Sequence, residues 1–373
     1  MVITKDKEVL ILKTRKLLLS IILAIALLLG NIPGVIATPP AAPVPVKNLV
    51  VHFIDVGQAD STLIQMPDGK VSLIDAGNAK DATTIINYIK ALGIKKLDFV
   101  IGTHPHEDHI GGMAEVIKAF EIGKIYMPKV AATTKTYENL LLTIKSKKLL
   151  IDTPKAGTDI YLTKEIKYSL LAPVAATYKE MNDYSIVTKL TYKNNSFLFA
   201  GDAEKLSEDQ IIAAKYSLKA DVLKVGHHGS TTSSSPAFVK AVSPKYSIIS
   251  VGAGNTYNHP DNIIINRLKT YGEVHRTDLE GTITVTSDGT NLTLKAPKVA
   301  NVTAPVPKPS VVTPVKPTAP TTPAAPIDSV VYVTKTGTKY HRANCSSLSQ
   351  SKIEIKLSDA KAKGFEPCDK CKP

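Results

Sequence analysis

Short apolar runs separated by glycine and polar residues recur through the central part of the chain. Such runs, bounded by turn-forming residues, are typical of buried β-strands. They predict strands at residues 50–56, 61–66, 71–74, 97–101, 124–127, 166–171, 185–192, 197–200, 222–225, 246–251 and 282–285. A helix is expected through Leu92 with Asp81 as its N-cap. Strand-like and helix-like stretches alternate, so the pattern predicts a mixed α/β domain with enough strands for two sheets.

The N-terminal segment has a different pattern. Lys13, Arg15 and Lys16 precede an apolar run at 17–30, and a candidate cleavage site ending in Ala37 follows at 35–37. This order is typical of a secretory signal peptide, so we expect cleavage after residues 1–37 and a secreted protein without an integral membrane domain. The alternative is a retained membrane anchor, but the purely apolar run is shorter than the roughly 20 residues that a spanning helix needs.

Two proline-rich segments divide the rest of the chain. A short spacer occupies residues 38–47, and a long Pro/Thr/Ala-rich linker occupies residues 298–328. Such a composition cannot bury a core, and the longer segment is expected to be a semi-rigid extended tether. The sequence therefore predicts one large domain at residues 48–297 and a small module at residues 329–373.

The chain is basic. Its 373 residues include 46 Lys+Arg and 33 Asp+Glu, a formal net charge of +13, and without residues 1–37 it keeps 41 basic and 31 acidic residues, a net charge of +10. This balance favours polyanionic partners such as nucleic acid, phosphate-rich envelope polymers or anionic membrane. An even spread of charge over a solvated surface is the alternative that needs no partner.

A dense group of potential metal ligands follows the strand expected at residues 97–101. It comprises His104, His106, Asp108 and His109, in a chain with only nine histidines. Imidazole nitrogens and carboxylate oxygens suit ions such as zinc or manganese. Adjacent side chains diverge, so the first two histidines would turn toward one ion and Asp108 with His109 toward a second, as in a two-metal hydrolytic site. An exposed polar loop with chance histidines is the alternative.

Single carboxylates follow two other predicted strands. Asp75 comes directly after the strand at 71–74, where it could orient a ligand histidine or simply form a turn. Asp202 comes after the strand at 197–200 and could bridge two cations, because a buried carboxylate needs a positive partner. Taken alone, Asp202 could instead cap a helix.

A histidine pair, His227 and His228, follows a further strand and precedes a run of hydroxyl residues. One histidine could bind metal while the other contacts substrate or protonates the leaving group, although such a pair can also be merely exposed. Ser230, Thr231 and Lys224 are expected to hold or admit a phosphate.

The segment after the strand at 246–251 contains Asn258 and His259, which we expect to contact substrate if their loop reaches the same edge. A lone loop histidine could equally have no such role. His52 and His275 are interpreted as structural.

Six of these segments, in order along the chain, resemble the metallo-β-lactamase superfamily, and within it the extracellular-type domain of the ComEC competence proteins and their stand-alone relatives. The segments are HFIDVGQADSTLI (52–64), LIDAG (73–77), THPHEDHIGG (103–112), FLFAGD (197–202), DVLKVGHHGS (221–230) and NHP (258–260). The resemblance covers roughly residues 48–297. It implies an αββα sandwich with a dinuclear metal site at the edge between the two sheets.

The resemblance also implies a role for each matching residue. The first metal would be bound by His104 and His106, the second by Asp108 and His109, and both by a bridging Asp202. Within the histidine pair, His228 is the better match to a metal ligand, which leaves His227 near the substrate.

One position departs from the family pattern. Superfamily members with a complete first site use a further histidine before the bridging aspartate, but no histidine lies between Gly111 and Gly201. Either Asn182 or Asp183 would complete that site, or the site is weak and filled by solvent. The departure also argues against β-lactam hydrolysis.

All three cysteines lie in the C-terminal module. The potential ligands are His341, Cys345, Cys368 and Cys371. Three thiolates and one imidazole satisfy tetrahedral zinc, and a module of this size needs a staple, so one structural zinc is expected. In a secreted protein, a disulfide from Cys345 to one of the other two is the alternative. The module resembles small metal-binding tails of secreted nucleases, which suggests a tether to nucleic acid or the cell envelope.

Together these features predict a secreted dinuclear metallohydrolase, with two zinc or manganese ions, that cleaves phosphodiester bonds, most readily in DNA. Asp108, Asp202, His227 and His259 are the residues expected to act in catalysis. The alternatives are hydrolysis of another ester, such as a phosphocholine ester or lactone, and a non-catalytic extracellular protein that binds nucleic acid or envelope polymer.

Overall fold

The computed structural model describes residues 48–153, 155–297 and 330–371, the last range without 335–336, 343–344 and 349–350. The predicted signal peptide (1–37), spacer (38–47) and linker (298–328) lie outside the described residues. The chain divides into two compact units, Met1–Val302 and Thr303–Pro373. None of the helices in the described part combines the length and apolar character needed to span a bilayer.

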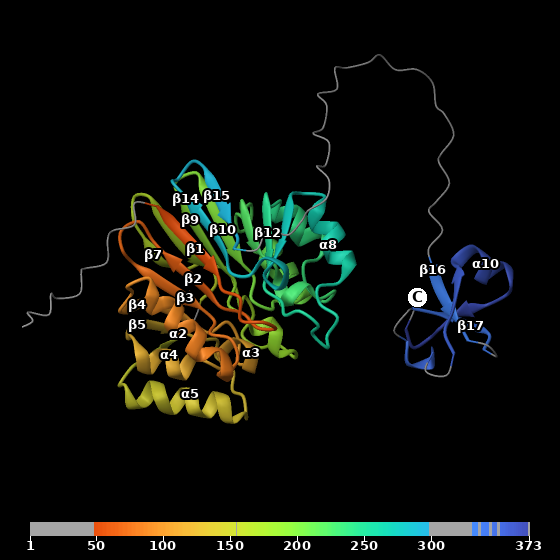
Figure 1. The fold of residues 1–373 in the computed structure, drawn as a ribbon, viewed down its shortest axis with the longest axis horizontal. Helices are drawn as coiled ribbons and strands as arrows, with labels where there is room; N and C mark the ends of the chain where they lie inside the picture. Colours follow the sequence, from red (N-terminus) through yellow and green to blue (C-terminus); the bar gives the residue numbers. More distant parts are fainter. Residues whose placement is uncertain are drawn as a thin grey trace, which may run out of the picture. The chain divides into compact units, whose positions relative to one another are not determined.

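The first unit contains an eight-stranded sheet with the order β15-β14-β1-β2-β3-β4-β5-β6 (Figure 1). Pairing is antiparallel from β15 to β3 and parallel from β3 to β6. The strands are β1 (Leu49–Phe53), β2 (Thr62–Gln65), β3 (Val71–Ile74), β4 (Lys96–Ile101), β5 (Glu121–Tyr126), β6 (Ile151–Asp152), β14 (Ile283–Ser287) and β15 (Leu292–Lys295).

A seven-stranded sheet with the order β13-β12-β11-β10-β9-β8-β7 forms the other half of this unit. Its strands are parallel from β10 to β13 and antiparallel from β7 to β10. The strands are β7 (Asp159–Leu162), β8 (Ile166–Leu170), β9 (Thr188–Tyr192), β10 (Asn195–Phe199), β11 (Val222–Lys224), β12 (Tyr246–Ile249) and β13 (Glu273–Arg276).

Helices cover the outer face of each sheet. Those packed on the first sheet are α2 (Ala82–Ala91), α4 (Met113–Ala119) and α5 (Lys135–Ser146), which Figure 1 shows in a layer below β3, β4 and β5. Those packed on the second sheet are α6 (Lys205–Ala213), α7 (Pro236–Val242) and α8 (Asn262–Lys269). Shorter turns of helix are η1 (Ala79–Asp81), α3 (Glu107–Ile110), η2 (Met181–Tyr184), η3 (Gly226–Gly229) and α9 (Thr277–Glu280). The predicted αββα sandwich is confirmed.

Strand β10 illustrates how the sandwich is held together. Its side chains Phe197 and Phe199 point into the core between the two sheets, and Leu198 points into the core under the helices. All three are at most 2% exposed. Because successive side chains of a strand alternate between faces and both faces are covered, the strand is continuously apolar, which is why it was recognisable in the sequence. Full burial of each such side chain stabilises the fold by about 1.5–3 kcal/mol.

Some boundaries differ from the prediction. The strand expected at 185–192 begins only at Thr188, because the hydroxyl of Ser185 is used near the predicted ligands, where it accepts a hydrogen bond from the amide of Asp202 at 3.0 Å. Asp81 does precede α2, but its carboxylate accepts from the amide of Asn78 at 2.9 Å instead of capping α2. Strands β6, β7, β13 and β15 were not predicted, since each is short and exposed or half-buried along its whole length.

In its described residues, the second unit has a small sheet with the strand order β18-β16-β17-β19, one α-helix and a short 3-10 turn. Its elements are β16 (Val330–Val333), β17 (Lys339–His341), η4 (Ser346–Leu348), β18 (Ile353–Lys356), α10 (Leu357–Ala362) and β19 (Glu366–Pro367). Its main apolar cluster has four buried members, Val331, Val333, Tyr340 and Ala360. A core of this size gives little stabilisation by itself.

Candidate metal centre

The predicted ligands converge with neighbouring polar residues because parallel strands of both sheets end at the same edge of the sandwich. The residues of this site come from five connections: Asp60 from the β1–β2 loop, Asp75 after β3, His104 to His109 after β4, Asp202 after β10, and His227 with His228 after β11. Ligand sites of α/β folds gather at the carboxyl ends of parallel strands, where side chains from the connecting loops converge.

Glycines allow these loops to approach one another closely. A Cβ on Gly112 would lie 2.3 Å from the carbonyl oxygen of Ala76, and one on Gly111 would lie 2.4 Å from the amide nitrogen of Ala79. Only glycine permits such contact between backbones. The loop that carries Asp75 can therefore pack directly against α3, which carries Asp108 and His109.

Asp202 lies at the centre of the histidines. Its Oδ2 atom lies 3.3 Å from Nε2 of His109, 3.9 Å from Nε2 of His104, and 3.8 Å from Nε2 of both His227 and His228. The carboxylate is buried. This central position is the one that a carboxylate shared between two ions would occupy.

Two overlapping groups of ligand atoms surround Asp202. In each group, the candidate atoms all lie within 4.8 Å of one another, and the groups are His104, His109 and Asp202, and Asp108, His109 and His228. His106 adjoins the first group, with its Nδ1 atom 2.9 Å from Nε2 of His104. In the second group, Asp108 Oδ2 lies 3.2 Å from His228 Nε2. His109 belongs to both groups, whereas the sequence prediction placed it with the second metal alone.

Asp75 fixes the orientation of His109. His109 Nδ1 lies 2.8 Å from Asp75 Oδ2, and the same carboxylate accepts hydrogen bonds from the amide and hydroxyl of Thr103 at 2.8 and 2.7 Å. An imidazole that donates from Nδ1 to a carboxylate presents the lone pair of Nε2 on its other side. The structure thus turns His109 Nε2 toward Asp202.

Asp60 contacts His228 on the side away from Asp202, as Asp75 contacts His109. Asp60 was not identified from the sequence. Its Oδ1 lies 3.4 Å from His228 Nδ1, which also lies 2.9 Å from the carbonyl oxygen of Ser250. Burial would raise the pKa of Asp60, but Lys224 and His228 outweigh it and bring the pKa to about 2. Asp60 does not directly follow a strand and its neighbours are the small residues Ala59 and Ser61, so only its place in the family-like segment at 52–64 could have indicated it.

Lys224 is not at the phosphate entrance where we expected it. The side chain is 2% exposed, and its Nζ donates to Asp60 Oδ2 at 2.6 Å and to the carbonyl of Val225 at 3.0 Å. It neutralises Asp60 and cannot reach solvent. Ser230 is also buried, with its hydroxyl 3.1 Å from that of Thr232, whereas Thr231 is exposed but does not line the pocket.

A pocket of about 430 Å³ opens over the cluster. The residues that line it include His106, Asp108, Asn182, Asp202, His227, His228 and His259. Of the predicted substrate contacts, His259 therefore lies at the pocket, while Asn258 is exposed and does not line it.

Two residues were candidates for the ligand position at which this chain lacks the family's histidine, Asn182 and Asp183. Their side chains point in different directions. The Asn182 side chain lines the pocket and donates to Glu204 at 3.1 Å. Asp183 is buried, and its Oδ1 accepts from the amide of Ser207 at 3.2 Å, near the start of α6. Asn182, and not Asp183, is the one that the fold brings to the ligand cluster.

The electrostatics of the cluster favour cations. Burial would raise the pKa of Asp202, but the neighbouring histidines, His109 first, hold it well below its ordinary value. Burial would likewise lower the pKa of His228, but Asp202 and Asp60 raise it to about 10. The buried carboxylates thus require positive charge close by, from protonated imidazole or from a metal, and binding of metal to such histidines releases protons.

The residues present fit divalent metal ions. Among the described residues, His109 Nε2 and Asp202 Oδ1 are buried without a hydrogen-bond partner, as is Asn182 Oδ1. Leaving such an atom unpaired costs about 1–3 kcal/mol, so several at one point indicate a missing partner. Consecutive left-handed backbone at His227 (φ 47°) and His228 (φ 51°) is a further strained feature of the kind concentrated at functional sites.

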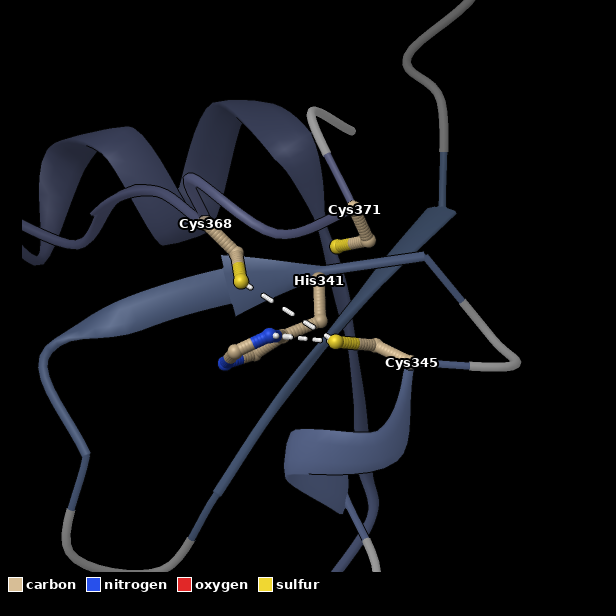
Figure 2. Close-up of side chains that lie close together, drawn as sticks. All are labelled: His341, Cys345, Cys368 and Cys371. Atoms are coloured by element: carbon tan, nitrogen blue, oxygen red, sulfur yellow. Dashed lines mark hydrogen bonds between the residues drawn. The ribbon is translucent and has the colours of Figure 1, made fainter.

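A second group of potential ligands lies in the C-terminal unit, as Figure 2 shows. The ligand atoms of His341, Cys345, Cys368 and Cys371 all lie within 4.8 Å of one another. Nδ1 of His341 is 3.3 Å from the sulfur of Cys345, which is 3.9 Å from that of Cys368. The three cysteines are free. Hydrogen bonding from the Cys371 amide, the largest effect, lowers the pKa of Cys368, which favours the thiolate that binds metal.

Comparison with known proteins identifies the class. The profile of the metallo-beta-lactamase superfamily matches residues 54–253, more than half of the chain. The chain therefore belongs to this superfamily, the class of metal-dependent hydrolases that the sandwich and its ligand cluster define.

Within the superfamily, the chain is similar to three bacterial proteins. It is 32% identical to ComE operon protein 3 of Bacillus subtilis over 62% of this chain and 32% of that protein. It is 30% identical to competence protein ComA of Neisseria gonorrhoeae over 67% and 34%, and 32% identical to recombination protein 2 of Haemophilus influenzae over 63% and 28%. The matched region spans about a third of the length of each relative.

Proposed function

We propose that this protein is a dinuclear metal-dependent hydrolase that cleaves phosphodiester bonds, with DNA as its substrate. The observation that carries the proposal is the position of Asp202 beside an open pocket, with its Oδ2 atom within 4.0 Å of four histidine nitrogens. A shared carboxylate between two sets of ligands supports a pair of ions rather than one.

Two ions, zinc or manganese, would be held by His104, His106, Asp108, His109, Asp202 and His228, with Asn182 at the position that lacks a histidine. Such ions supply Lewis-acid stabilisation of phosphoryl oxygens and lower the pKa of water. Asp75 would keep His109 in the ligating tautomer, and Asp60 with Lys224 would hold His228 in place.

The remaining two histidines of the pocket would act on the substrate. Nδ1 of His227 lies 2.9 Å from the hydroxyl of Thr232 and 3.4 Å from Glu204, so its Nε2 atom is the one turned toward the pocket side of Asp202. This histidine would protonate the leaving oxygen. Burial lowers the pKa of His259, so at neutral pH it would be uncharged and would orient the substrate by hydrogen bonding.

DNA is proposed as the substrate on two grounds. The formal charge of +13 favours a polyanion. In addition, two of the similar proteins are named for competence and recombination. Both names refer to processes that involve DNA, and we infer that this chain also acts on DNA.

The proposal is tested by metal analysis of the purified protein together with cleavage assays on DNA and on bis-p-nitrophenyl phosphate. His106→Ala and Asp202→Asn should each lower kcat by at least about 100-fold while the protein stays folded. His275→Ala, which removes a histidine bound to Glu280 outside the cluster, is the matched control and should keep its activity.

Other substrates are distinguished in the same experiment. Turnover of a phosphocholine ester or a lactone without cleavage of DNA would replace the proposed substrate but keep the metal centre. Binding of DNA that is unchanged in Asp202→Asn, with no turnover of any ester by the wild type, would instead identify a non-catalytic binding protein.

We further propose that the C-terminal unit holds one structural zinc through His341, Cys345, Cys368 and Cys371. We also propose that the protein is secreted and that this unit tethers it to nucleic acid or the cell envelope. Detection of the mature protein outside the cell, with its N-terminus near residue 38, and its release on deletion of residues 329–373 would support these two proposals.

A further inference from the structure

An exposed tyrosine stands at the edge of the pocket. Tyr257 lines the pocket together with His227 and His259, yet its side chain is 66% exposed. Among the described residues, Tyr271 is the other tyrosine or phenylalanine that is exposed, at 37%, and it does not line this pocket. Tyr257 therefore presents an aromatic ring to solvent beside the proposed active site.

The loop that carries Tyr257 is fixed by a single side chain. Asn255 Oδ1 accepts hydrogen bonds from the amides of Tyr257 and His259, both at 3.1 Å. Its Nδ2 donates to the carbonyls of Gly252 at 2.9 Å and His259 at 2.7 Å. Four hydrogen bonds with the half-buried amide group of Asn255 hold the backbone of this loop in a defined turn, which fixes where the tyrosine side chain leaves the backbone.

Three rings lead from this tyrosine to the metal ligands. The rings of Tyr257 and His259 are stacked, with centroids 5.7 Å apart and an angle of 24° between their planes. His259 then meets His227 edge to face, at 5.5 Å and 75°. Nε2 of His227 lies 3.8 Å from Oδ2 of Asp202. His259 lies against one face of the tyrosine, and the side chain as a whole stays 66% exposed.

We propose that the exposed ring of Tyr257 is a stacking platform for a nucleobase, next to the phosphodiester that is cleaved. Aromatic side chains bind single-stranded nucleic acids in this way, and they tolerate any sequence because every base has a flat π face. A base within a duplex has both faces covered by its neighbours, so the platform would select single-stranded or unpaired DNA. This inference rests on the proposed phosphodiesterase function and adds to it the kind of substrate.

The test compares two oligonucleotides that differ only in their bases. One is an ordinary single strand, and the other carries abasic residues on the same phosphodiester backbone. Tyr257→Ala should lower kcat/KM for the ordinary strand by about 5- to 150-fold, the loss expected for one stacked base, and should leave the abasic strand unchanged. Tyr257→Phe, which keeps the ring, should stay within about threefold of the wild type. Tyr271→Ala is the matched control and should change neither.

Binding without cleavage separates this inference from the proposed function. The metal-loaded protein is mixed with a cleavage-resistant phosphorothioate strand that contains the fluorescent base 2-aminopurine. Stacking on Tyr257 should quench its fluorescence in the wild type and in Tyr257→Phe, but not in Tyr257→Ala. Quenching by a wild type that cleaves no nucleic acid would contradict the hydrolase proposal and support the platform. Equal behaviour of Tyr257→Ala and wild type toward both strands would overturn the platform, and the exposed ring would then serve another contact, such as a protein partner.

Discussion

At the scale of single residues, the carboxylates that orient the candidate metal ligands are as important for the site as the ligands themselves. Asp75 lies 2.8 Å from Nδ1 of His109 and is itself held by Thr103. Hydrogen bonds of this type fix the tautomer and direction of a ligating imidazole. The free energy of metal binding should therefore depend on a residue that does not contact the metal.

We predict that Asp75→Asn weakens metal binding by about 10- to 100-fold, because the amide is a poorer acceptor for His109 and removes a negative charge. The affinity can be measured by competition with a fluorescent chelator. Asp98→Asn is the control, since it alters a carboxylate paired with the partly exposed Lys70. Equal metal affinities of Asp75→Asn and Asp98→Asn would show that Asp75 only shapes the turn.

The pair of Asp60 and Lys224 shows why some residues were assigned wrongly or missed. The two residues are separated by 164 positions in the chain, yet they form a buried ion pair of 2.6 Å. From the sequence, Lys224 next to a histidine pair indicated phosphate binding, and Asp60 had no evident use. In the folded protein, the β1–β2 loop packs against the end of β11, and Asp60 paired with Lys224 then holds His228 in position.

At the scale of elements, an ion pair joins edge strand β13 to helix α9. His275 Nδ1 on the strand lies 2.9 Å from Glu280 Oε2 on the helix, and Glu273 faces its other nitrogen at 3.5 Å. Burial would lower the pKa of His275, but the two glutamates outweigh it and raise the pKa above its ordinary value. A raised pKa means that the protonated histidine is more favourable in the folded state than in the unfolded state.

We predict that the contribution of His275 to stability depends on pH. It should be fully present below about pH 6.5, the ordinary pKa of histidine, and be lost as the pH rises through the raised pKa of the folded state. Relative to wild type, His275→Gln should lose about 1 kcal/mol of unfolding free energy at pH 5.5 and almost nothing at pH 9. Chemical denaturation of both proteins at the two pH values measures this difference, and a loss that does not vary with pH would contradict the pairing.

At the scale of the whole molecule, the two units differ in what stabilises them. The first has three large apolar clusters, between the sheets and under each layer of helices. The second has a small cluster of four buried residues beside the group of three cysteines and one histidine. A domain with so small a core commonly depends on a metal for folding.

We predict that removal of metal unfolds the C-terminal unit and leaves the first unit folded. Structural zinc contributes on the order of 10 kcal/mol in small domains, more than a core of this size provides. Limited proteolysis of the full chain with mass spectrometry, before and after a chelator, should show new cuts within residues 330–371 only. Cys368→Ser should show these cuts without the chelator. Resistance of this region to protease in both cases would indicate that no metal stabilises it.

The sequence by itself determined the features that depend on neighbours in the chain. Buried strands such as β10 were evident because burial on both faces requires a continuous apolar run. The His104 to His109 segment and the Cys368 and Cys371 pair were evident because metal ligands close in sequence leave a recognisable spacing. The mixed α/β class followed from the alternation of strand-like and helix-like stretches, and the αββα sandwich was implied by the resemblance of six segments to the metallo-β-lactamase superfamily.

The tertiary structure decided which distant groups meet and which way they point. It selected Asn182 over Asp183 for the pocket, buried Lys224 against Asp60, and stacked Tyr257 on His259 beside His227. These outcomes depend on how loops from several strand ends pack against one another. Periodicity and spacing report only local structure, so they carry no information about contacts of this kind.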